Sequence, residues 1–182
     1  MQKQTGLYVI TGGPGTGKTS LIEELKRSGF KAVEEVAREI IKEQMQQGGE
    51  ALPWKNTGLY TKSMLERSIE SYLANAGSDG ILFFDRGIPD TLAYARLIGL
   101  ADTEKIEQAV DQYRYNNLVF ILPPWEEIYC TDKERKQLFN EAIDTYYVMK
   151  DVYKKAGYTL IEIPKLSVME RRNFVINCIR ES

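Results

Sequence analysis

The stretch that decides the fold is GGPGTGKTS, at residues 12–20. It matches the phosphate-binding pattern G-x-x-x-x-G-K-[ST] in full. The glycines let the backbone turn so that several N–H groups point at one anion. A helix that begins near residue 18 would add its positive N-terminal end. We therefore expect nucleotide contacts from Gly12, Gly13, Pro14, Gly15, Thr16, Gly17, Lys18, Thr19 and Ser20.

Two side chains of this loop have individual roles in the pattern. Lys18 can reach the β- and γ-phosphates, and the Thr19 hydroxyl can ligate magnesium. A chance match in a glycine-rich turn is the alternative. The flanks argue against it, because a buried-strand pattern at residues 7–10 precedes the loop and apolar residues at helical spacing follow it. The sequence thus predicts binding of a nucleoside triphosphate with magnesium.

Strand-like and helix-like segments alternate along the rest of the chain. Further apolar runs predict strands at residues 31–33, 81–84, 118–122 and 159–163. Amphipathic spacing predicts helices at about residues 36–48, 65–75, 89–97, 106–113, 139–156 and 168–179, with a loop at 49–58. Apolar strands joined by helical crossovers predict an α/β fold with a parallel sheet covered on both faces.

Size and composition indicate one domain spanning residues 1–182. The net charge of −2, with no block of like charges, gives nucleic acid binding no electrostatic support. Zinc sites of histidine and cysteine are excluded, because the chain has no histidine and two widely separated cysteines. The chain shows no signal-peptide pattern and no apolar run of about 20 residues, so we expect a cytoplasmic protein without a membrane partner.

A second candidate site follows the predicted strand at 81–84. Asp85 could hold a magnesium-bound water at the end of that strand, or it could cap a turn. Arg86 would lie where ligands bind in open α/β sheets, and it could clamp a phosphate or form a surface ion pair. Asp90 could contact a substrate hydroxyl or serve as a helix-start carboxylate.

Carboxylates also follow the short strand at 31–33. If that strand is real, Glu34 and Glu35 lie at the same sheet edge as Asp85. There a carboxylate could orient or deprotonate an acceptor hydroxyl. The first turn of a solvated helix explains the same residues equally well.

The charged segment at residues 125–136 has two readings. It could close over the phosphates as a lid and exclude water, or it could form a solvated helix start. Within the lid interpretation Arg135 is the preferred residue, because a guanidinium matches phosphate geometry. Trp54, Tyr60 and Trp125 could stack on a base, although packing explains each of them.

Together these pieces resemble the P-loop kinases related to nucleoside and nucleotide kinases. The closest likeness is to a small single-domain P-loop ATPase/kinase family that includes the ribosylnicotinamide kinase domain. The matching segments are residues 12–19, 35–39, 85–90, 123–125, 132–135 and 157–164. The resemblance implies a three-layer P-loop NTPase fold with a five-stranded parallel sheet in the order 2-3-1-4-5. It also implies an acceptor-binding region at about 35–75 and a lid at about 125–136.

The resemblance further implies roles for three residues: Glu35 binds or deprotonates the acceptor, Arg86 contacts acceptor or phosphate, and Arg135 is the lid arginine. We expect a phosphotransferase that uses ATP and Mg²⁺ on a small nucleoside-like or nucleotide-like acceptor. A homodimer is compatible with this expectation. With few arginines in the lid segment, a neutral acceptor is at least as plausible as a nucleoside monophosphate. An ATPase that drives a conformational change or partner interaction, and a non-catalytic nucleotide-binding module, are the alternatives.

Overall fold

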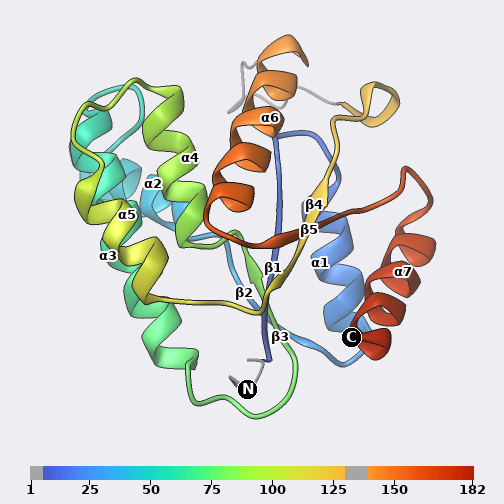
Figure 1. The fold of residues 1–182 in the computed structure, drawn as a ribbon. Helices are drawn as coiled ribbons and strands as arrows, with labels where there is room; N and C mark the ends of the chain where they lie inside the picture. Colours follow the sequence, from blue (N-terminus) through green and yellow to red (C-terminus); the bar gives the residue numbers. More distant parts are fainter. Residues whose placement is uncertain (1–5, 130–138) are drawn as a thin grey trace.

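The structure is a computed structural model that describes residues 6–129 and 139–182 (Figure 1). Its strands are β1 (Leu7–Gly12), β2 (Lys31–Val33), β3 (Leu82–Asp85), β4 (Leu118–Leu122) and β5 (Thr159–Glu162). Its helices are α1 (Lys18–Arg27), α2 (Val36–Gln47), α3 (Thr57–Asn75), α4 (Ile88–Leu97), α5 (Glu104–Gln112), the 3-10 turn η1 (Glu126–Ile128), α6 (Phe139–Lys155) and α7 (Val168–Glu181).

The strands form one parallel sheet in the order β2-β3-β1-β4-β5, which confirms the predicted order. In the centre, Ile10 of β1 lies opposite Asp85 of β3 and Phe120 of β4. The carboxyl ends of β1 and β3 are therefore side by side. The loop after β1 and the polar residues after β3 emerge at one edge of the sheet.

Helices cover both faces of the sheet (Figure 1). Alternate residues of a strand point to opposite faces. Leu7 and Val9 belong to the core under α4, α5 and α6, whereas Tyr8 and Ile10 belong to the core under α1 and α7. All of β1 is buried. This explains why its sequence reads as a continuous apolar run rather than as an alternating one.

Helices α2 and α3 lie within residues 35–75, the region predicted to bind the acceptor. Helix α3 is longer than the apolar spacing indicated. It begins at Thr57, because the Asn56 side chain caps it by accepting a hydrogen bond from the Leu59 N–H at 2.9 Å. Tyr60 and Met64 in its first turns pack against Ile40 of α2. The loop predicted at 49–58 is thus shorter than expected at its carboxyl end.

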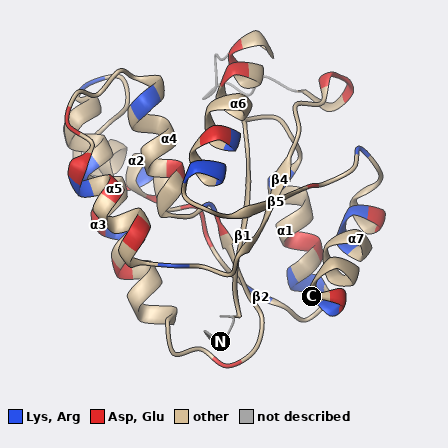
Figure 2. Ribbon diagram, viewed as in Figure 1, with Lys and Arg blue, Asp and Glu red and all other residues tan. Residues whose placement is uncertain are grey.

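Acidic and basic residues are interspersed along α3, α6 and α7 (Figure 2). None of the helices in the two described ranges combines the length and the apolar run that a bilayer span requires.

Candidate functional site

The loop between β1 and α1 requires glycine at two positions. Gly15 has φ 70° and Gly17 has φ 79°, in the left-handed region that only glycine adopts without strain. Packing adds to the requirement, because a Cβ on Gly15 would lie 2.6 Å from a ring carbon of Tyr129. The Thr16 hydroxyl closes the turn by donating to the Gly13 carbonyl at 3.0 Å. The sequence pattern therefore forms the compact loop that it predicts.

Lys18 and Asp85 form a buried ion pair across the ends of β1 and β3. The ammonium of Lys18 donates to Asp85 Oδ1 and lies 3.6 Å from Glu35 Oε2. Burial lowers the pKa of Lys18, with Arg86 acting in the same direction. Burial also raises the pKa of Asp85, although the charge of Lys18 opposes the rise. Each group is thus the counter-ion of the other where little water reaches them.

Glu35, at the N-terminus of α2, lies among three cations. Its Oε1 accepts a hydrogen bond from Arg86 Nε at 2.8 Å, and its Oε2 pairs with Arg38 Nε at 2.8 Å. Burial alone would raise the pKa of Glu35. The charges of Arg86, Lys18 and Arg38 outweigh burial and hold the pKa well below its usual range. Glu35 is therefore an ionised, buried carboxylate.

Asp90 joins this cluster to α4 and α6. It accepts hydrogen bonds from the Thr11 hydroxyl at 2.5 Å, the Tyr153 hydroxyl at 2.6 Å and the Gly87 N–H at 2.8 Å. Arg86 Nη1 lies 3.3 Å from the same carboxylate. The helix-start interpretation of Asp90 is thus confirmed, because the Gly87 contact caps α4. Its other oxygen orients Arg86 as well.

Arg86 is the only non-glycine residue of the described ranges with a positive φ, at 74°. This conformation costs roughly 1–2 kcal/mol for a residue with a Cβ. The Arg86 N–H donates to the Ile10 carbonyl at 3.0 Å, so the backbone is held at the end of the sheet. Strained residues cluster at functional sites. Here the bend turns the guanidinium toward Glu35 instead of solvent.

The two predicted magnesium ligands lie at this edge of the sheet. Thr19 is exposed in the first turn of α1, and Asp85 ends β3. A hydroxyl and a carboxylate are the oxygen donors that Mg²⁺ prefers. The donor set therefore fits the ion, with Lys18 as the present partner of the Asp85 carboxylate.

Other predicted residues lie apart from the cluster. Glu34 is exposed and pairs with Lys26, which fits the solvated helix start. Trp54 is 60% exposed in the loop before α3. Tyr60 is buried, with its ring centroid 5.5 Å from that of Tyr94, and therefore packs in the core.

Arg135 lies outside the described residues, as does most of the predicted lid at 125–136. Its first part, residues 125–129, follows β4 and packs on the phosphate loop. There a Cβ on Gly17 would lie 3.2 Å from Ile128 Cδ1, and the Tyr129 ring lies beside Gly15.

Sequence reasoning missed Arg171 in α7. Arg171 is 4% exposed, and its Nη1 donates a hydrogen bond to the Thr16 carbonyl at 3.3 Å. Its guanidinium carbon lies 5.6 Å from the centroid of the Trp125 ring. A signal was present, because Arg171 falls between Val168 and Val175 at helical spacing, on the stripe that should be apolar.

Comparisons with known proteins support the architecture. A family profile described as an AAA domain matches residues 7–171. No curated protein matches the chain. Deoxyadenosine kinase from M. mycoides with bound dATP superposes with a TM-score of 0.65 at 15% identity, over 96% of this chain and 99% of that chain.

Two other solved structures are similar in the same way. The NadR protein in complex with NR has a TM-score of 0.72 at 18% identity, over 96% of this chain and 50% of that chain. Thymidylate kinase from Ehrlichia chaffeensis has a TM-score of 0.60 at 17% identity, over 98% and 100% of the two chains. At such identities the likeness establishes the fold.

Proposed function

Because the chain belongs to the AAA domain family and has the fold of P-loop nucleoside and nucleotide kinases, we propose that it is an ATP- and magnesium-dependent phosphotransferase. Its acceptor is a small nucleoside-like or nucleotide-like molecule. The observation that carries this proposal is the cluster of Lys18, Asp85 and Glu35, which joins the phosphate loop to the ends of two neighbouring strands. Donor and acceptor groups thereby share one buried site.

The donor half of the site consists of the loop at residues 12–20. Its N–H groups and the N-terminal end of α1 hold the β- and γ-phosphates. Lys18 leaves Asp85 and binds the phosphate oxygens. Thr19 and Asp85 would hold Mg²⁺, which supplies charge neutralisation at the β- and γ-oxygens.

The acceptor half of the site consists of Glu35 and Arg86. The low pKa of Glu35 keeps it ionised, so that it can accept a hydrogen bond, and makes it a weak base. Phosphoryl transfer has a loose transition state that needs little deprotonation of the nucleophile. Glu35 therefore orients the acceptor hydroxyl, while Arg86, held by Glu35 and Asp90, contacts the acceptor or the transferred phosphoryl group.

The wider assignment follows from these roles. Residues 1–182 act as one cytoplasmic kinase-like domain, with an acceptor region at about 35–75 and a lid at about 125–136 that supplies Arg135. Its partners are ATP and the acceptor, and neither nucleic acid nor a membrane is among them. The assignment is compatible with a homodimer.

A second candidate function is ATP hydrolysis that drives a conformational change or a partner interaction. The description of the matching family as an AAA domain favours it. This function predicts steady turnover without an acceptor, whereas the kinase predicts turnover that depends on one.

The deciding experiment measures ADP release from ATP and magnesium with a panel of nucleosides, nucleoside monophosphates and ribosylnicotinamide. Lys18→Ala is the control, with its fold checked by circular dichroism. A hundredfold stimulation by one acceptor, about 2.7 kcal/mol of barrier, supports the kinase. Acceptor-independent turnover that Lys18→Ala abolishes supports the ATPase. Turnover that survives in Lys18→Ala contradicts both.

A further inference from the structure

The guanidinium of Arg171 lies behind the phosphate loop, against the backbone of Thr16 and Gly17. Its Nη1 donates to the Thr16 carbonyl at 3.3 Å. A Cβ on Gly17 would lie 2.9 Å from that Nη1 and 3.2 Å from Nη2, so the guanidinium touches the glycine directly. The Trp125 ring, 5.6 Å away, holds the guanidinium by a cation–π contact.

The charge of Arg171 has no carboxylate partner in the part of the chain that the structure describes. Its Nε is buried there without a hydrogen-bond partner. Burial lowers the pKa of Arg171, with no neighbouring charge to offset it. The next residue behaves differently, because Arg172 pairs with Glu24 at 3.1 Å.

The position of this charge matters because Gly17 is the N-cap of α1. The N-terminus of a helix is already positive, and a cation beside it is unfavourable unless an anion is also present. An uncompensated, buried arginine at this end of α1 therefore points to an anionic ligand in the loop.

Peptide geometry shows how Arg171 would act. In a trans peptide the carbonyl and the N–H point in opposite directions, and the described residues contain no cis peptide. By holding the Thr16 carbonyl on the outer side of the loop, Arg171 turns the Gly17 N–H to the opposite side. That side is the interior of the loop, where phosphate binds in this motif.

We propose that Arg171 is a positioning residue for the polyphosphate of the nucleotide. It fixes the Thr16–Gly17 peptide with its N–H directed at the phosphate, and it adds positive charge at the start of α1. This inference rests on the nucleotide site of the proposed function and names a residue outside the phosphate-loop motif.

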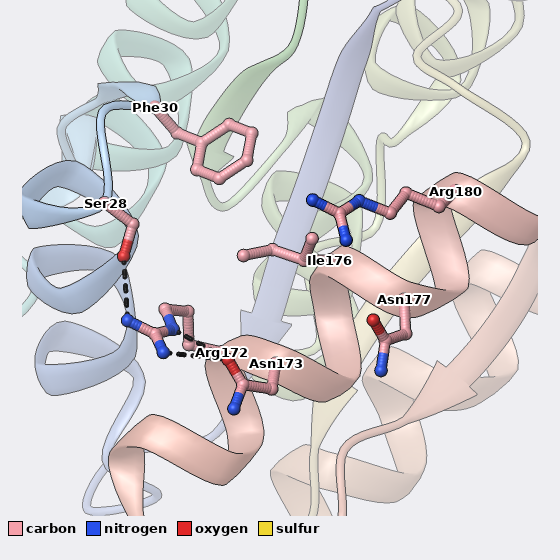
Figure 3. A pocket seen from close by; sticks show the side chains of 7 residues that line it. All are labelled: Ser28, Phe30, Arg172, Asn173, Ile176, Asn177 and Arg180. Atoms are coloured by element: carbon pink, nitrogen blue, oxygen red, sulfur yellow. Dashed lines mark hydrogen bonds between the residues drawn. The ribbon is translucent and has the colours of Figure 1, made fainter.

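The test measures binding of Mg-ATP and of inorganic tripolyphosphate by calorimetry to wild type, Arg171→Met, Arg171→Lys and Arg172→Met. Arg172→Met is the matched control, because it removes the same charge one residue along α7. Arg172 faces a pocket of about 480 Å³ beside the carboxyl end of α1, where it contacts Ser28 and Asn173 (Figure 3). Thermal unfolding of each protein reports any structural damage.

We expect Arg171→Met to weaken the binding of both ligands at least tenfold, which is about 1.4 kcal/mol. Equal losses for ATP and tripolyphosphate would place the effect at the phosphates and not at the base. Arg171→Lys should recover most of the affinity, and Arg172→Met should bind within about twofold of wild type. Wild-type affinity in Arg171→Met, or an equal loss in Arg172→Met, overturns the inference.

Two further results are informative. If Arg171→Met does not fold, Arg171→Gln replaces it, since an amide can donate to the Thr16 carbonyl but carries no charge. Wild-type affinity in a folded Arg171→Gln would overturn the charge role, and a loss of at least threefold would support it. If wild type binds neither ligand, the proposed function itself fails and this inference with it.

Discussion

Glu35 and the cations around it make the stability of the protein depend on pH. Its folded pKa lies below the ordinary value of 4.5, so ionised Glu35 stabilises the fold fully above about pH 4.5. The contribution is lost progressively as the pH falls toward the folded pKa. Asp85 has a raised pKa and acts in the opposite sense, but it is present in every protein compared below.

We therefore expect Glu35→Gln to lower the free energy of unfolding by about 3 kcal/mol at neutral pH, the cost of breaking a buried ion pair. The difference from wild type should shrink below pH 4.5. Urea unfolding of both proteins above and below pH 4.5 measures this difference in the free energy of unfolding. The exposed Glu34→Gln is the control and should stay within about 0.5 kcal/mol of wild type. A deficit that does not change with pH would contradict the assignment.

Single residues were predictable where their signal is local in the sequence. Lys18 belongs to a contiguous pattern, and Asp85 ends an apolar run, so both could be placed without a structure. Asp90 was ambiguous because its cap is local, whereas its contacts with Thr11 and Tyr153 depend on the fold. Arg171 left a local signal in its place on the apolar stripe of α7, but its role depends on Thr16, which is far away in the chain.

At the scale of elements, α6 reaches the candidate site through the Tyr153 hydroxyl and through the Met149 sulfur, which lies 3.9 Å from Arg86 Nη1. Tyr153 is fully buried and donates to Asp90, which in turn contacts Arg86. Helix α6 follows the predicted lid, so this contact connects the lid side of the molecule with the acceptor side.

Tyr153→Phe removes that hydroxyl and leaves the Asp90 carboxylate with one donor fewer. We expect a stability loss of about 1–3 kcal/mol. We also expect about a tenfold lower kcat with the acceptor, equivalent to about 1.4 kcal/mol, because Arg86 is less well oriented. ATP affinity should change little, because Tyr153 does not touch the phosphate loop.

The kcat of acceptor-dependent ADP release and a separate ATP titration distinguish these effects. Tyr147→Phe makes the same change at a site on α6 that is 62% exposed, and it should match wild type. An equal fall in kcat for both variants would contradict the proposed connection.

Elements were predictable where periodicity is strong. Within the residues that the structure describes, each strand and α-helix overlaps a predicted range, because buried strands and amphipathic helices leave distinct patterns. The start of α3 was not found, since its signal is one capping residue, Asn56, and not a period. The strand order came from the family resemblance, because apolar spacing does not say which strands are neighbours.

At the scale of the whole molecule, nucleotide binding should stabilise the native state. A ligand at a hundred times its Kd adds about 2.7 kcal/mol to the free energy of unfolding. For a chain of 182 residues this corresponds to a rise in Tm of roughly 5–10 °C. Thermal unfolding with and without Mg-ATP measures it. Lys18→Ala should show no rise, and an equal rise in that variant would place the nucleotide elsewhere.

The architecture also explains why the fold and the phosphate-loop residues were easier to predict than the proposed acceptor region. The phosphate loop is one contiguous stretch, whereas the proposed acceptor region combines α2, α3 and the end of β3. Glu35 and Arg86 are 51 positions apart in the chain and meet only when β2 pairs with β3. Their approach is a property of the assembled sheet.

The central position of β1 has a consequence for synthesis of the chain. Residues 7–12 are synthesised before both of their partners, β3 and β4, which end at Asp85 and Leu122. At about 5–20 residues per second the loop waits roughly 5–20 s for β4. Nascent chains stalled before Leu118 should therefore leave the loop open to proteases and unprotected by ATP. The phosphate loop thus becomes competent only after β4, a strand far later in the chain, has been synthesised.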